Sequence, residues 1–121
     1  MKLKYHDWLT QLTSIPTAAG REDRVIAWVE RFVARWRNVT LSRDRFGNIT
    51  LSRRTAGGGR PIYFTAHMDH PAFVVREVQS ARQLTAAFRG GVARDYFKGT
   101  KVLLHHHDAQ PQRGVVRDFV K

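Results

Sequence analysis

The sequence has 121 residues, 42% hydrophobic content and a formal net charge of +11, and it contains no cysteine. This length suits one domain with a modest core. The missing cysteine excludes disulfides, thiolate nucleophiles and cysteine-bound zinc, so a metal would have to bind His, Asp or Glu. Without a membrane-length apolar run of roughly 18 residues or a signal sequence, we expect a cytoplasmic protein with no membrane partner.

Two helices are expected at the N-terminus. Apolar residues keep helical spacing over 5–12, and Pro16 then disfavours helical angles in the residue before it. A second amphipathic helix is expected over 22–36, with Trp28 and Trp36 in the core. Arg31 and Arg35 are four residues apart, and we place them opposite the apolar stripe on a solvated face.

A hairpin is expected next. Segments 39–42 and 49–52 are rich in β-forming residues and flank a turn that contains Gly47 and Asn48. The glycine-rich stretch 56–61 is interpreted as a connector. Segment 62–66 is short and continuously apolar, which predicts a central strand buried on both faces.

The character of the chain changes after Pro71. Only short strands are predicted in this half, without a helix between them, at 73–78, 84–88, 102–105 and 114–120. The sequence therefore predicts an α/β fold, or α+β within this chain, divided into segments 1–71 and 72–121.

His67 and Asp69 follow the predicted buried strand. Two residues apart in an extended backbone, they share a face, so the imidazole can bind a metal while the carboxylate fixes its orientation. At the C-terminal end of a strand they would lie where α/β sheets bind ligands. Of the histidines at 105–107, only His105 and His107 could share a metal, and a solvent-exposed hairpin end is the favoured interpretation.

Several segments, in this order, resemble the start of the cocatalytic dinuclear-zinc aminopeptidases, the glutamyl and deblocking enzymes that assemble as tetrahedral particles. The resemblance spans nearly the whole chain and rests on Leu12–Pro16 with Gly20-Arg21-Glu22, Asp44–Asn48, Ala66–Val75, Gly90-Gly91 and Arg113–Val116. His70 departs from it, because that position is often glutamate in the family.

The resemblance implies a zinc-exopeptidase-type catalytic domain followed by part of an inserted β-barrel domain. His67 would be a zinc ligand, and Asp69 the catalytic-site carboxylate that orients it. The complete family site holds two divalent ions, zinc or also cobalt or manganese, and hydrolyses N-terminal residues from peptide substrates. Its other ligands and general base lie after the β domain, whereas this sequence ends at Lys121, so we expect no activity from the chain alone.

Two classes of function therefore remain open. The first is the N-terminal portion of a homo-oligomeric metallo-aminopeptidase, a hydrolase. The alternative is a non-catalytic basic α+β module that binds a protein partner or nucleic acid. The sequence does not favour nucleic acid, because the positive charge supplies affinity for phosphates but comes with no recognition motif.

Overall fold

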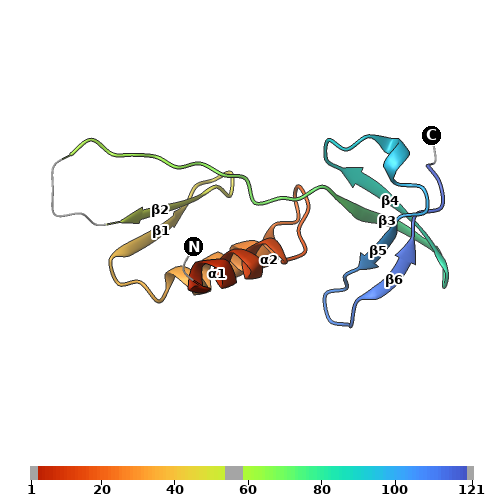
Figure 1. The fold of residues 1–121 in the computed structure, drawn as a ribbon, viewed down its shortest axis with the longest axis horizontal. Helices are drawn as coiled ribbons and strands as arrows, with labels where there is room; N and C mark the ends of the chain where they lie inside the picture. The colour runs from red at the N-terminus through yellow and green to blue at the C-terminus, as the bar shows by residue number, and fades with distance from the viewer. Residues whose placement is uncertain (1–2, 54–58, 120–121) are drawn as a thin grey trace. The chain divides into compact units, whose positions relative to one another are not determined.

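The computed structural model describes residues 3–53 and 59–119. The chain has a mixed α/β fold and divides into two compact units, Met1–Asp69 and His70–Lys121 (Figure 1). The strands of the described residues form three two-stranded antiparallel sheets, and no described helix could cross a membrane. The mixed α/β class predicted from the sequence is confirmed.

Both predicted helices are present in the first unit. Helix α1 spans Leu3–Thr13 and helix α2 spans Asp23–Val33. An edge-to-face aromatic contact joins them, with the Trp8 ring centroid 4.9 Å from that of Phe32, and a second one places Trp8 6.2 Å from Trp36, which follows α2. Helix α2 ends earlier than predicted, because the Trp36 N–H donates to the carbonyl of Val33 in a tight turn.

The predicted hairpin is also confirmed. Strands β1 (Val39–Arg43) and β2 (Ile49–Arg53) pair along their whole length. In the turn between them, Asp44 Oδ1 accepts hydrogen bonds from the backbone N–H groups of Phe46 (2.8 Å) and Asn48 (2.9 Å). Gly47 has a φ of 87°, which glycine adopts without strain.

This turn leads to a prediction about Asp44. Its hydrogen bond from the Asn48 side chain (2.8 Å), helped by the backbone donors, lowers the pKa of the carboxyl group. A lowered folded-state pKa means that the ionised carboxylate stabilises the fold above its ordinary pKa, and that this contribution is lost as pH falls through the lowered value. Asp44→Ala should therefore lower the thermal midpoint at neutral pH, and the difference should shrink in strong acid. A difference that stays constant down to acidic pH would contradict the prediction.

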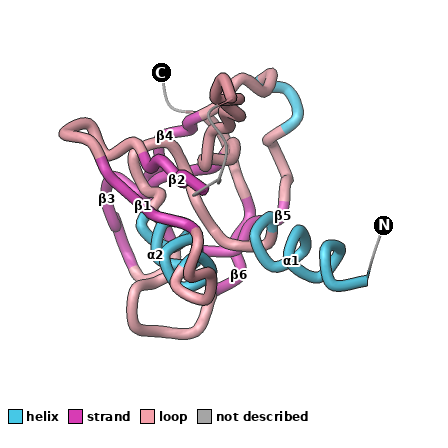
Figure 2. Tube along the Cα trace, turned by 90° about the vertical axis from the view of Figure 1, so that its left-hand side faces the viewer, coloured by secondary structure: helices cyan, strands magenta, loops and turns pink. Residues whose placement is uncertain are grey.

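The predicted central strand at 62–66 is wrong. The chain there is an irregular connection, drawn without an arrow between the grey trace and β3 in Figure 1 and as loop in Figure 2. Ile62 and Tyr63 are each 81% exposed and Phe64 is 93% exposed. The physical reason is that a central strand needs neighbours on both edges, while β1 and β2 pair only with each other. Of the predicted connector 56–61, residues 56–58 lie outside the described residues.

The second unit consists mainly of short strands, as predicted. Strands β3 (Ala72–Ser80) and β4 (Gln83–Arg89) form one hairpin, and β5 (Lys101–Leu104) and β6 (Gln112–Val115) form another. Two details differ from the prediction. A 3-10 helix, η1, occupies Arg94–Tyr96, and β6 ends at Val115 instead of continuing toward residue 120, which itself is outside the described residues.

The core is smaller than the hydrophobic content suggests. Among the described residues only four are buried, namely Ala18, Val25, Val33 and Phe97. Trp28 is half-buried, and Trp36 is 43% exposed, so the prediction of a core position is wrong for Trp36. Two-stranded sheets have little surface to cover a core, and each unit is small, which explains the limited burial.

Candidate metal centre

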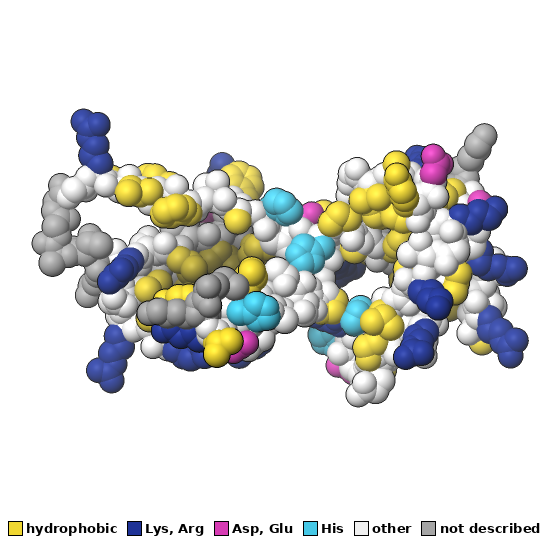
Figure 3. Space-filling view, in the orientation of Figure 1, with side chains coloured by type: hydrophobic (Ala, Val, Ile, Leu, Met, Phe, Trp, Pro, Cys, Tyr) yellow, Lys and Arg dark blue, Asp and Glu magenta, His cyan; other side chains and the backbone are white. Residues whose placement is uncertain are grey.

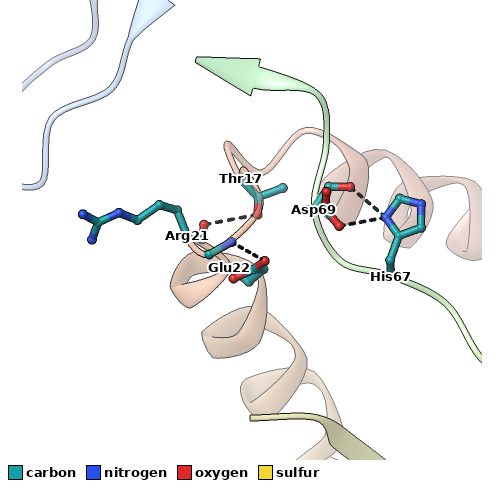
Figure 4. A network of polar contacts seen from close by, with 6 residues as sticks. Thr17, Arg21, Glu22, His67 and Asp69 are labelled. Carbon is teal, nitrogen blue, oxygen red and sulfur yellow. Dashed lines mark hydrogen bonds and ion pairs between the residues drawn. The ribbon is translucent and has the colours of Figure 1, made fainter. Parts of the chain in front are cut away.

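His67 and Asp69 contact each other in the first unit. His67 Nδ1 lies 3.1 Å from Asp69 Oδ1 and 3.0 Å from the Asp69 backbone carbonyl oxygen. Figure 4 shows both contacts on one ring nitrogen, with the other nitrogen turned away from Asp69. The His67 side chain is 81% exposed and that of Asp69 is 34% exposed. The residues lie in the irregular connection before β3 and not at the end of a strand.

This geometry suits a metal-binding imidazole. Both acceptors near Nδ1 are oxygens, so the neutral ring satisfies them by donating its Nδ1–H. That tautomer leaves the lone pair of Nε2 available to bind a metal. A carboxylate hydrogen-bonded to the opposite ring nitrogen also fixes the orientation of the ring.

The donor set in this chain is nevertheless incomplete. No group of three His, Asp or Glu side chains able to hold a metal occurs among residues 3–53 and 59–119. A zinc site needs three or four protein ligands, so His67 and Asp69 fit one ligand with its orienting partner and not a whole site. His70, the next histidine along the chain, belongs to the second unit.

The histidines at 105–107 do not form a second candidate site. Strand β5 ends at Leu104, so these residues lie in the connection to β6. His107 Nε2 is 3.8 Å from Asp108 Oδ1, with side chains 94% and 91% exposed. The favoured interpretation as a solvent-exposed hairpin end agrees with this position.

The loop before α2 has more internal structure than the sequence indicated. Figure 4 shows the Gly20 N–H donating to Glu22 Oε1 (2.8 Å) and Thr17 Oγ1 donating to the Arg21 carbonyl (3.2 Å). The Arg21 N–H also donates to the Ala18 carbonyl (2.8 Å). Gly20 has a φ of 74°. A glycine followed two residues later by glutamate was the signal for this turn, since the side chain can reach back to the glycine N–H.

A surface formed by α2 and the turn after it was also not predicted. Trp28, Arg31, Phe32 and Arg35 together line one hollow, so the two arginines adjoin the aromatic residues. Both arginines are exposed, as predicted for a solvated face, but their predicted place opposite the apolar stripe is wrong. The spacing i, i+3, i+4 and i+7 was the available signal, because such positions share one face of a helix. In the face drawn in Figure 3, Lys and Arg side chains surround both units and acidic side chains are few.

Comparison of the chain with protein-family models, with curated proteins and with solved structures gave no match. The contact between His67 and Asp69 and the order of the sequence segments are therefore the grounds for a functional proposal.

Proposed function

We propose that this chain is the N-terminal portion of a metal-dependent aminopeptidase, in which His67 binds a divalent cation. The observation that carries the proposal is the 3.1 Å contact between His67 Nδ1 and Asp69 Oδ1, which directs Nε2 of an exposed imidazole away from its partner. The ordered resemblance of the surrounding segments to dinuclear-zinc aminopeptidases supports the same function.

In this proposal, the first unit begins a zinc-exopeptidase-type α/β domain and the second unit is part of an inserted β-barrel. The exposed side chains of Ile62, Tyr63 and Phe64 support it, because an apolar segment of this kind is expected to pair inside a larger sheet. The strands that would cover it, and the remaining metal ligands, would come from outside the described residues.

The proposal gives His67 and Asp69 distinct roles. His67 would supply one imidazole ligand, and Asp69 would hold the ring in the metal-binding tautomer and orientation. When bound, zinc would supply Lewis-acid activation of a peptide carbonyl and of water. Since the described donors do not complete a zinc site, no catalytic step is assigned to this chain alone.

Zinc titration of the purified chain, followed by ¹⁵N NMR of the histidine rings, tests the proposal. We expect a weak zinc-dependent shift at His67 Nε2 and no hydrolysis of aminoacyl p-nitroanilides. Asp69→Asn should weaken zinc binding at His67 by roughly 10- to 100-fold, because it removes the orienting carboxylate.

His107→Ala is the matched control, since His107 is also exposed and also has a carboxylate nearby. It should leave the His67 shift unchanged. A titration in which His67 Nε2 does not respond to zinc, or in which Asp69→Asn binds as well as the original chain, would contradict the assigned roles.

A further inference from the structure

One face of α2 and of the turn after it forms an open hollow of about 300 Å³, lined by Trp28, Arg31, Phe32 and Arg35. We call this surface the α2 groove. The rings of Trp28 and Phe32 stack with centroids 4.9 Å apart and an interplanar angle of 12°. The Arg35 guanidinium carbon lies 4.8 Å from the Phe32 centroid. Planar aromatic and cationic groups are therefore adjacent along the groove.

The groove carries uncompensated positive charge. Within the described part of the chain, neither Arg31 nor Arg35 forms an ion pair with an acidic side chain. Glu30, the acidic residue next to Arg31, instead pairs with Arg43 at 2.8 Å. The Arg35 Nε–H donates one hydrogen bond, to the Phe32 carbonyl (3.4 Å). Covering the groove with apolar protein would desolvate two guanidinium groups that have no ion-pair partner among the described residues, which is costly, whereas an anionic ligand would pair with them.

We propose that the α2 groove binds single-stranded nucleic acid. Unpaired bases stack on Trp28, and Arg31 and Arg35 pair with the phosphates on either side. Single-strand binders combine aromatic stacking surfaces with a positive groove, and such binding tolerates any base sequence. The net charge of +11 adds long-range attraction for the phosphates.

The α2 groove supplies the site that the composition alone did not identify. The first observation is the stacked pair Trp28 and Phe32, and the second is the unpaired charge of Arg31 and Arg35. Neither His67 nor Asp69 takes part, so this proposal does not rest on the proposed aminopeptidase function.

Fluorescence anisotropy of a labelled oligo-dT of about 15 nucleotides, titrated with the full chain, tests the proposal. Trp28→Ala should weaken binding roughly 5- to 150-fold, the usual effect of losing one stacked base. The double variant Arg31→Ala/Arg35→Ala should reduce the slope of log K against log salt by about 1.4, because two phosphate contacts are lost. The exposed arginines keep the test valid if Trp28→Ala does not fold.

Arg45→Ala/Arg53→Ala is the matched control, because it removes the same charge from two exposed positions of the hairpin. This control should weaken oligo-dT binding less than Arg31→Ala/Arg35→Ala does, and Trp28→Phe should retain most of the affinity for oligo-dT. The proposal is overturned if Arg45→Ala/Arg53→Ala weakens oligo-dT binding as much as Arg31→Ala/Arg35→Ala does. It is also overturned if a duplex binds as tightly as the single strand, or if oligo-dT does not bind.

Discussion

Phe97→Ala should remove most of the stability of the second unit. The Phe97 ring is buried and contacts three other rings, with centroid distances of 5.2 Å to Phe73, 4.5 Å to Phe88 and 5.7 Å to Phe119. Truncating a buried phenylalanine costs about 3–5 kcal/mol. That loss is comparable with the whole stability of a unit this small, at roughly 0.05–0.15 kcal/mol per residue. We therefore expect β3 to β6 to lose amide exchange protection.

The neighbouring residue provides the control. Tyr96 is 76% exposed, and its backbone groups make the hydrogen bonds of the turn, so Tyr96→Ala should change the free energy of unfolding by less than about 0.5 kcal/mol. Because all three tryptophans lie in the first unit, amide exchange is a better measure here than tryptophan fluorescence. Equal protection in Phe97→Ala and Tyr96→Ala would mean that the ring cluster is not the core of this unit.

Features that depend on neighbouring residues were predictable from the sequence. The helices at Leu3–Thr13 and Asp23–Val33 follow from apolar residues at helical spacing, and the hairpin follows from two β-rich segments around a turn. Strands β3, β4 and β5 also match predicted segments within two residues at each end, whereas β6 overlaps its predicted segment only at Gly114 and Val115. In each case the stabilising contacts lie within one helix or between adjacent strands.

Features that depend on distant residues were not predictable in the same way. Segment 62–66 has the composition of a buried strand, but burial requires neighbouring strands, and the described sheets do not provide them. Phe97 was not identified as a core residue, because it follows the short helix η1 and its ring partners lie on other elements. Periodicity along the chain contains no information about such contacts.

The candidate site likewise has a local contact that was predictable and distant ligands that were not. The contact between His67 and Asp69 is local, and the spacing of two residues was enough to predict their proximity. A third metal ligand would have to come from elsewhere in a fold, and the described residues do not supply one. The local sequence pattern therefore predicted the contact between His67 and Asp69 but no further metal ligand.

Gly90→Ala should destabilise the second unit by about 2–3 kcal/mol. Gly90 has a φ of 149°, a backbone conformation that residues with a side chain rarely adopt. An added Cβ would also lie 2.8 Å from Pro71 Cβ, 2.9 Å from Pro71 Cα and 3.0 Å from Phe88 Cζ. Because Pro71 precedes β3 and Gly90 follows β4, the clash would separate the paired ends of this hairpin.

Gly91→Ala separates this clash from a general effect of replacing glycine. Apart from Gly91 and its two chain neighbours, no residue has a heavy atom within 4 Å of a Cβ added there, so we expect the free energy of unfolding to change by less than about 0.5 kcal/mol. Urea denaturation followed by far-ultraviolet circular dichroism, with amide exchange at Ala72 and Arg89, compares the two variants at the paired end of the sheet. If both alanine variants lose the same stability, the close approach of Gly90 to Pro71 does not hold this hairpin together.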